Sequence, residues 1–279
     1  MWGRVCVLKK IFRVCRFIAA HRANQESSAR RHAMPARETE AIILKTFPLG
    51  EADRLVSFFG RSSGRLRGVA AGARKVKNRY GSTLEVLSHV QLWYVERETR
   101  DLVRIQQCEL LESFNKAQSD YGLSTGLAMI SEIVERVLPE GEAAEAMFRL
   151  LLLVVRETER RGSWELPLAY FAFWTVKLGG WLPSFGACAE CRKSLGEGPA
   201  FFFAHSAGLF CEDCRKPGMR PLSKRGRALG ELFTRKKLDA IELPDDSGKT
   251  LSALRDASFA SIEFHTERRL QTREFLETT

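Results

Sequence analysis

The sequence predicts an α+β fold, in which a small N-terminal β-barrel is followed by a helical domain with an inserted cysteine-rich hairpin. Three observations carry this prediction. Short β-rich runs fill residues 40–111, the apolar spacing becomes helical after Phe114, and two Cys-x-x-Cys pairs lie between residues 188 and 214. The chain of 279 residues is long enough to bury a sizeable core. The predicted parts are a basic tail over 1–33, a barrel over 34–113 and a helical domain over 114–279, with a zinc ribbon at 186–216.

The strands of the barrel are predicted by five runs rich in β-branched and aromatic residues, separated by turn residues. These runs cover residues 41–47, 54–59, 64–73, 89–96 and 102–111. The stretch ETRD at 98–101 is typical of a hairpin turn between the last two strands. Five strands in about 75 residues fit a small barrel, and the oligonucleotide/oligosaccharide-binding (OB) fold is the commonest such barrel.

The helical domain is predicted by apolar residues that step by 4, 3, 4 and 3 positions along Leu123, Leu127, Ile130, Val134 and Val137. On this helix Glu132 and Glu135 are expected on the solvent face. A similar pattern over 147–158 predicts a second helix, and the almost wholly apolar run 166–181 predicts a buried central one. Further helices are expected at 222–236 and 251–277.

The two Cys-x-x-Cys pairs, Cys188 with Cys191 and Cys211 with Cys214, are separated by 19 residues. Each such turn can place two sulfurs on one side of a metal ion, and a hairpin between the pairs would complete a tetrahedral zinc shell. Residues 201–203 and 209–210 are strand-like, with a turn expected at 206–208. One zinc ion per chain is therefore the predicted cofactor.

The alternatives for the cysteines are weaker. Disulfides are disfavoured because the chain has seven cysteines and no convincing secretory signal. A redox pair would need one Cys-x-x-Cys at the start of a helix rather than two pairs facing each other. His205 could replace a ligand, but four thiolates already fill the shell. A closed shell has no position for a reacting water, so the zinc is interpreted as structural.

The net charge of +10 is concentrated at the start of the chain. Residues 1–33 hold eight of the 44 Lys and Arg residues and one of the 34 acids, so they contribute +7 and leave +3 to the rest. This tail could be a membrane-surface helix or a targeting sequence. We favour the other interpretation, a true start at Met34, because the strand pattern begins promptly at Thr39.

The densest basic segment outside the tail is RSSGRLRGVAAGARKVKNRY, residues 61–80, which contains no acid. Such clustering on a barrel favours nucleic-acid binding, with cations on phosphates and an aromatic ring stacked on a base. A solvated loop that only keeps the protein soluble is the alternative. The predicted contacts are Arg61, Arg65, Arg67, Arg74, Lys75, Lys77 and Arg79, with Tyr80 as the stacking residue.

The segment ETEAIILKTFPLGEADRLVSFFGRSSGRLRGVAAGARKVKNRYGSTLEVLSHVQLWY, together with the later cysteine pairs, resembles the DNA recombination and repair protein RecO family. The resemblance covers residues 38 to about 270, and the first 33 residues depart from it. It implies an OB barrel, a helical domain and a zinc ribbon. It also implies a mediator that binds and anneals single-stranded DNA, contacts double-stranded DNA, and works with RecR and indirectly with RecA.

In this family the helical domain is expected to engage the acidic, hydrophobic C-terminal tail of single-stranded DNA-binding protein. The resemblance further implies a bacterial cytoplasmic protein associated with the nucleoid. No run of about 18 apolar residues predicts a membrane span. An RNA-binding module of translation or transcription remains the alternative function. No nucleophile with a base, paired acids or phosphate loop predicts an enzyme.

Overall fold

The computed structural model describes residues 36–97, 100–203 and 206–276. The chain divides into Met1–Ala36 and one compact unit, Arg37–Thr279, which contains every element described below. The predicted tail, residues 98–99 of the predicted hairpin turn, and His205 lie outside the described residues.

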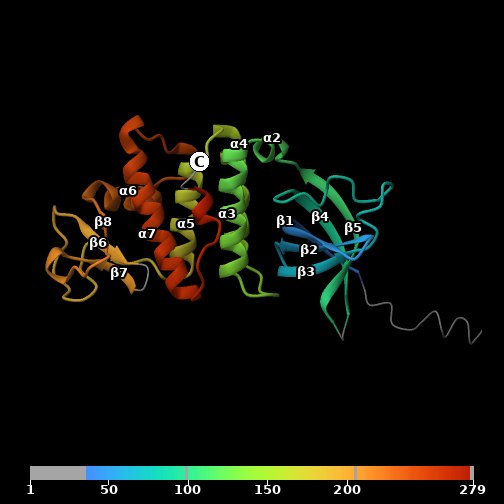
Figure 1. Cartoon of the computed structure of the whole chain (residues 1–279), viewed down its shortest axis with the longest axis horizontal. Coiled ribbons are helices and arrows are strands. Elements are labelled where there is room, and N and C mark those ends of the chain that lie inside the picture. The colour runs from blue at the N-terminus through green and yellow to red at the C-terminus, as the bar shows by residue number, and fades with distance from the viewer. Residues whose placement is uncertain (1–35, 98–99, 204–205, 277–279) are drawn as a thin grey trace, which may run out of the picture. The chain divides into compact units, whose positions relative to one another are not determined.

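The predicted five-stranded barrel is confirmed: the strands close in the order β1-β2-β3-β5-β4 (Figure 1). Neighbouring strands are antiparallel except β3 and β5, which pair in parallel. The strands are β1 Arg37–Leu49, β2 Asp53–Gly60, β3 Gly64–Ala70, β4 His89–Arg97 and β5 Arg100–Glu112.

The continuous apolar run in β1 has a structural reason, because both faces of the strand are covered. Ala41 and Ile43 point into the barrel core, whereas Ile42 and Leu44 belong to the core shared with the helices. Successive side chains of a strand point to opposite faces, so a strand between two apolar layers needs no polar alternation. On the helix side, the Ser131 hydroxyl donates to the Leu44 carbonyl at 2.7 Å.

The helical region follows the predicted periodicity. Its first long helix is capped by Asp120, which accepts a hydrogen bond from the Leu123 amide, and the next ends at Gly162 in the left-handed conformation. The predicted central helix, α5, is buried around most of its circumference and contacts α3, α4 and α7 (Figure 1). The helices are α2 Asn115–Ser119, α3 Tyr121–Val137, α4 Glu145–Arg161, α5 Glu165–Leu178, α6 Lys224–Arg235, α7 Gly248–Thr266 and α8 Arg273–Leu276.

Two details of the helical prediction are wrong. The helix expected over 251–277 is interrupted, because α7 ends at Thr266 and Glu267 takes a left-handed backbone with φ of 54°. Glu132 is not on the solvent face. It is buried, and its carboxylate accepts hydrogen bonds from the backbone amides of Gln271 at 3.0 Å and Thr272 at 2.8 Å. The segment between α7 and α8 thus returns to cover α3.

The cysteine-rich segment forms a three-stranded sheet in the order β7-β6-β8, with strands β6 Ala200–Phe203, β7 Ser206–Phe210 and β8 Arg220–Leu222. The turn predicted at 206–208 is misplaced, because Ser206 already pairs with Phe203 and these residues belong to β7. Short 3-10 turns cover η1 Glu212–Cys214, η2 Leu238–Ala240 and η3 Asp245–Ser247. Apolar side chains of this sheet join the helical core rather than a core of their own.

Candidate metal centre and nucleic-acid interface

The four cysteines of the predicted metal site lie together. One Sγ from each of Cys188, Cys191, Cys211 and Cys214 falls within 4.8 Å of the others. All four are free thiols, and the Sγ atoms of Cys191 and Cys211 are 3.6 Å apart. Four sulfurs bound tetrahedrally at zinc–sulfur distances of about 2.3 Å would be separated by about 3.8 Å. The thiols are therefore already close to the arrangement that zinc needs.

Local backbone bonds build the two cysteine turns. In the first, the Cys188 amide donates to the Lys193 carbonyl at 2.9 Å, and Arg192 takes a left-handed φ of 62° to close the turn. The two turns are joined by the Ala189 amide, which donates to the Leu209 carbonyl at 2.7 Å. The Cys211 amide lies 3.4 Å from the Cys188 sulfur. Both pairs are thus positioned by short-range geometry.

The electrostatics of the cluster favour a cation. Burial raises the pKa of the Cys188 thiol, but the backbone amides of Cys191, Cys211 and Glu190 outweigh it and bring the pKa to about 6. At Cys214, burial and the neighbouring thiols together raise the pKa to about 12. Without a cation the four thiols cannot all ionise, because like charges at this spacing repel. A divalent ion would stabilise four thiolates at once.

A buried arginine of α6 binds the cysteine-rich segment that carries β6, β7 and β8, which we term the ribbon. Arg227 is 6% exposed, and its guanidinium donates to the carbonyls of Phe185 at 3.1 Å, Gly196 at 2.8 Å and Gly198 at 2.8 Å. These carbonyls belong to the segments that flank the first cysteine turn. The sequence alone does not reveal the role of Arg227, because a lone arginine in a helix carries no local signal of carbonyl partners that lie about 30 to 40 positions away.

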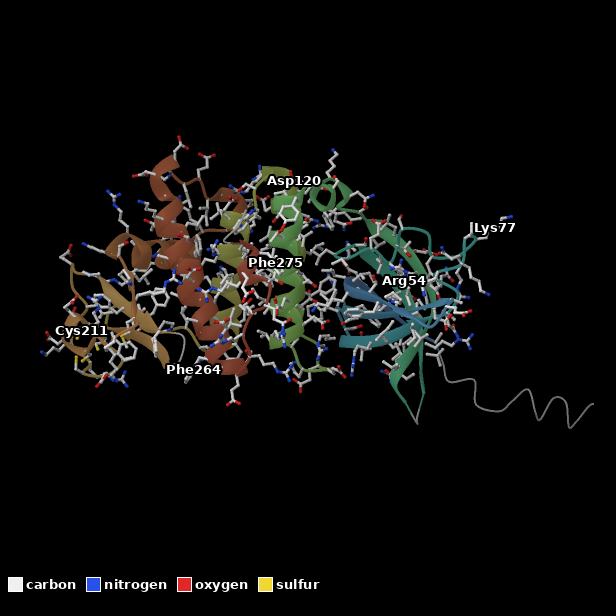
Figure 2. The ribbon with its side chains drawn as sticks, viewed as in Figure 1. Arg54, Lys77, Asp120, Cys211, Phe264 and Phe275 are labelled. Atoms are coloured by element: carbon white, nitrogen blue, oxygen red, sulfur yellow. The ribbon has the colours of Figure 1, made fainter. Side chains whose placement is uncertain are left out.

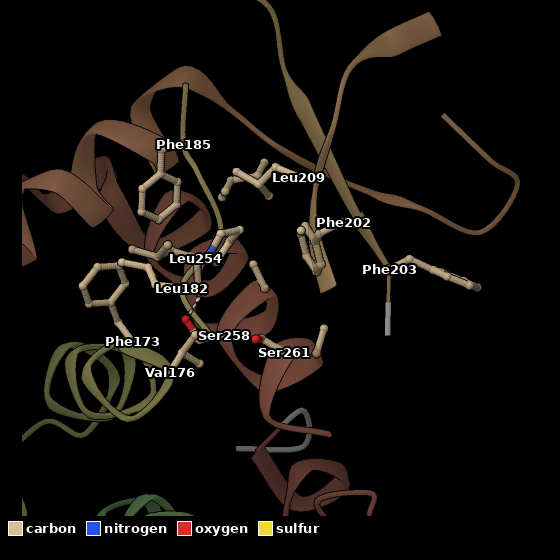
Figure 3. Close-up of a pocket in the computed structure, with 15 residues that line it drawn as sticks. Phe173, Val176, Leu182, Phe185, Phe202, Phe203, Leu209, Leu254, Ser258 and Ser261 are labelled. Carbon is tan, nitrogen blue, oxygen red and sulfur yellow. Dashed lines mark hydrogen bonds between the residues drawn. The ribbon is translucent and has the colours of Figure 1, made fainter. Parts of the chain in front are cut away.

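The ribbon sheet and the helices line a small, partly open apolar pocket of about 20 Å³ (Figure 3). Phe173 of α5, Leu254 of α7, and Phe202 and Leu209 of the ribbon lie around it. A volume of this size holds about one water molecule and no larger ligand. This junction is a packing interface, which explains why the ribbon and the helices share one core.

The seven cations of the basic segment have two different environments. Arg61, Arg65 and Arg67 are opposed by acids from other parts of the chain. Arg61 pairs with Glu40 at 2.9 Å and with Glu145 of α4 at 3.4 Å, and both Arg65 and Arg67 pair with Glu140, at 3.3 and 2.9 Å. Arg65 also donates to the Leu138 carbonyl at 3.0 Å. These arginines connect the barrel to the helical region, and their charge is largely balanced.

The other four cations, Arg74, Lys75, Lys77 and Arg79, are exposed on the loop between β3 and β4. Among the described residues, no carboxylate lies within ion-pair distance of any of them. Arg74 donates to the Gly50 carbonyl at 2.6 Å, which ties the loop to the β1–β2 turn. Lys77 extends from this loop in Figure 2. The unbalanced positive charge of the segment is therefore confined to residues 74–79.

The stacking role predicted for Tyr80 is contradicted by the structure. Its side chain is 2% exposed and belongs to the barrel core, and its hydroxyl donates to the Ile105 carbonyl at 3.0 Å. The Arg79 guanidinium also covers its ring, 5.0 Å from the ring centroid. A ring enclosed in this way offers no face to a base.

Two family models match the parts of the chain that carry the basic loop and the cysteine cluster. The family model "Recombination protein O N terminal" matches residues 34–114, and "Recombination protein O C terminal" matches residues 118–274. The chain belongs to the RecO family. The first match covers the barrel with its basic loop, and the second covers the helices and the four cysteines.

Several RecO relatives align over most of their length. DNA repair protein RecO of Koribacter versatilis is 34% identical over 236 residues, which cover 85% of this chain and 96% of the relative. The Nocardioides sp. protein of the same name is 32% identical, covering 85% of this chain and 98% of the relative. A third, from Syntrophobacter fumaroxidans, is 37% identical over 64% of this chain and 72% of the relative. The chain is therefore a member of a DNA repair family.

Within residues 36–97, 100–203 and 206–276, no helix combines the length and apolar character that a membrane span requires.

Proposed function

We propose that this chain is a DNA repair and recombination mediator that binds single-stranded DNA and anneals complementary strands. The observation that supports it most directly is the loop of exposed, unbalanced cations at Arg74, Lys75, Lys77 and Arg79 on a closed barrel. Phosphates attract such cations, and a barrel of this kind commonly holds a single strand.

Annealing requires no bond chemistry from the protein. Two single strands repel each other through their phosphates, so a mediator has to neutralise backbone charge while leaving base edges free to pair. Lysines suit this task because they contact phosphates as point charges and read no sequence. Lys75 and Lys77 would contact the backbone of the bound strand, and the same contacts would serve double-stranded DNA in the annealed product.

The metal proposed for the cysteine cluster is zinc, held by Cys188, Cys191, Cys211 and Cys214. Four thiolates would complete its shell, so the ion would stabilise the ribbon without supplying a reactive position. The proposed partners are RecR, the acidic C-terminal tail of single-stranded DNA-binding protein on the helical domain, and indirectly RecA, in the cytoplasm of a bacterium close to the nucleoid. No catalytic step is proposed.

The first test measures the salt dependence of binding to a labelled oligonucleotide. Binding of single-stranded DNA should weaken with salt, and the variant Lys75→Ala/Lys77→Ala should lower the log–log slope by about 1.4, at about 0.7 for each phosphate contact. It should also slow annealing of complementary strands. Arg74 is left in place because its bond to Gly50 shapes the loop.

The matched control is Lys236→Ala/Lys237→Ala, which removes the same charge from exposed positions after α6 and should leave the slope unchanged. Equal slopes for all three proteins would place the binding surface elsewhere. A competition between DNA and RNA strands of one sequence decides the nucleic acid, and a strong preference for RNA would favour the alternative RNA-binding function.

A further inference from the structure

The strand register places one row of side chains across all five barrel strands. Phe47 of β1 pairs with Leu55 of β2, and Leu55 with Val69 of β3. Val69 in turn pairs with Arg104 of β5, and Arg104 with Val95 of β4. Paired residues in neighbouring strands point to the same face of a sheet. These five side chains, which we term the outer row, therefore form one continuous stripe.

The outer row faces away from the barrel core. Its members alternate along each strand with core residues such as Val56 and Val103, which are 0% and 6% exposed. Phe47 is 50% exposed, Arg104 is exposed, and Leu55, Val69 and Val95 are half-buried. A single exposed apolar residue is ordinary on a protein surface, whereas a row in which four of five side chains are apolar and one end is a half-exposed aromatic ring requires an explanation.

Cations border the outer row on two sides. Lys45 stands two positions before Phe47 on the same strand and is half-buried. On the other side, the basic loop is attached to the β1–β2 turn that follows Leu49. The Arg74 amide donates to the Ala52 carbonyl at 2.9 Å, and the Gly72 amide donates to Asp53 Oδ1 at 2.8 Å. Lys75 and Lys77 therefore sit next to the turn that follows Phe47.

A mostly apolar row with an exposed ring at one end, with the cation Arg104 inside it and other cations at its border, matches the chemistry of a single strand: bases with flat apolar faces, and phosphates with negative charge. A duplex does not fit it, because paired bases are stacked on each other and hidden. We propose that bases of single-stranded DNA lie along the outer row, with Phe47 stacking on one base while Lys45, Arg104 and the basic loop contact phosphates. This proposal rests on the single-strand binding proposed above, and it gives Phe47 the stacking role that Tyr80 does not have.

The experiment compares two ligands that share a backbone and differ only in bases: a dT oligonucleotide and an abasic strand of the same length. Phe47→Ala should weaken binding of the dT strand roughly tenfold and leave binding of the abasic strand unchanged. The salt slope should stay the same, because no phosphate contact is removed. Phe47→Trp, which keeps a stacking ring, should bind the dT strand at least as well as the unaltered protein.

Two further variants test whether weaker binding of the dT strand comes from losing the Phe47 ring itself, rather than from lower stability or from the loss of any exposed ring. Phe47→Leu keeps an apolar side chain on β1 but has no ring, so it should lose binding to dT as Phe47→Ala does while unfolding at the same temperature as the unaltered protein. Phe264→Ala removes another exposed phenyl ring, 40% exposed on α7, and should leave binding unchanged.

The outcomes separate the two proposals. If the unaltered protein binds the dT strand and Phe47→Ala binds it equally well, the outer row is not the base platform, although single-strand binding stands. An equal loss on the dT and abasic strands would likewise overturn the stacking role. If the unaltered protein binds neither strand, the proposed function fails and takes this inference with it.

Discussion

The barrel and the cysteine ribbon both consist of short strands, but they are stabilised differently. The barrel closes five strands into a hydrogen-bonded ring around a core that comes almost wholly from residues 41–108. The ribbon has three strands of three to five residues, and its apolar side chains pack into the core of the helices. A sheet this small has too little apolar surface to fold alone. It depends on two additions, the proposed metal and the helices beneath it.

This difference separates the proposed functions of the two regions. The cations that we propose for DNA binding lie on the barrel, which has a core of its own, whereas the metal would stabilise a region that carries none of them. Conversely, because the ribbon shares its core with α5 and α7, replacing the cysteines should also lower the stability of the helical region.

Removing the metal should have the largest effect. Structural zinc contributes on the order of 10 kcal/mol to the folding of small zinc domains, so a strong chelator or Cys188→Ser/Cys191→Ser should unfold the ribbon and lower the thermal stability of the helices. Binding of single-stranded DNA by the barrel should persist. Metal analysis of the purified protein should find one zinc per chain; protein that contains no metal and four titratable thiols would contradict the zinc assignment.

Replacing Arg227 should destabilise the same region by a smaller amount. Arg227→Met leaves three carbonyl groups without their donor inside the ribbon–α6 junction, which should cost about 3 kcal/mol. Chemical denaturation measures the change. Arg225→Met is the matched control, because Arg225 lies on the same helix with an exposed side chain and an ion pair at 3.6 Å. Equal stabilities of the two variants would show that Arg227 does not fasten the ribbon.

The contact between Glu132 and the 271–272 amides should make stability depend on pH. Burial raises the pKa of Glu132, but hydrogen bonds from Thr272, Gln271 and Arg136 outweigh it and hold the pKa below the usual 4.5. A carboxylate with a lowered pKa stabilises the fold above its unfolded pKa, and this stabilisation is lost as the pH falls below about 4.5.

Glu132→Gln tests this contact directly. The variant should be less stable than the unaltered protein by about 1–3 kcal/mol at pH 7, and the difference should shrink below pH 4.5. Unfolding measured from pH 7 to pH 3.5 checks it, with the exposed Glu109→Gln on β5 as the control. A stability difference that stays constant over this range would rule out the titration of Glu132 as its cause.

The smallest effect is expected from removing residues 1–33. A protein that starts at Met34 should keep its fold and its annealing rate near physiological salt, because the strand pattern begins at Thr39 and salt screens the tail's +7 charge. At low salt the shorter protein should bind DNA somewhat less tightly. An insoluble or inactive product would show that the tail is part of the folded domain.

The sequence was most informative where a feature depends on neighbouring positions. Cys188 and Cys191, like Cys211 and Cys214, are brought together by single turns, so their spacing predicts their proximity. The apolar periodicity predicts the long helices for the same reason, and the β-rich runs predict the barrel strands, whose closure the structure adds.

Features that depend on distant partners were misjudged. The basic segment contains no acid, yet Glu140, which lies just after α3, approaches Arg65 and Arg67 from more than 70 positions away. The helical spacing predicts a solvent-facing Glu132, because nothing near it in the sequence reveals the segment that covers it. The basic loop predicts a base-stacking Tyr80, because a tyrosine there has no local sign of the Ile105 carbonyl to which it donates a hydrogen bond. Side-chain environment is set by tertiary packing, which spacing alone does not encode.

The bond between Glu132 and Thr272, 140 positions apart, also bears on how the chain folds during synthesis. The strands of the barrel are complete once residue 112 has emerged from the ribosome, and domains generally fold in order from the N-terminus. The buried carboxylate on α3 must wait for amides that are translated near the end. We therefore expect a nascent chain in which the barrel has already closed while the helical region, and the outer face of β1 with Ile42 and Leu44, still expose apolar surface. Chaperones would then find their binding sites on the helices and on this face of the barrel.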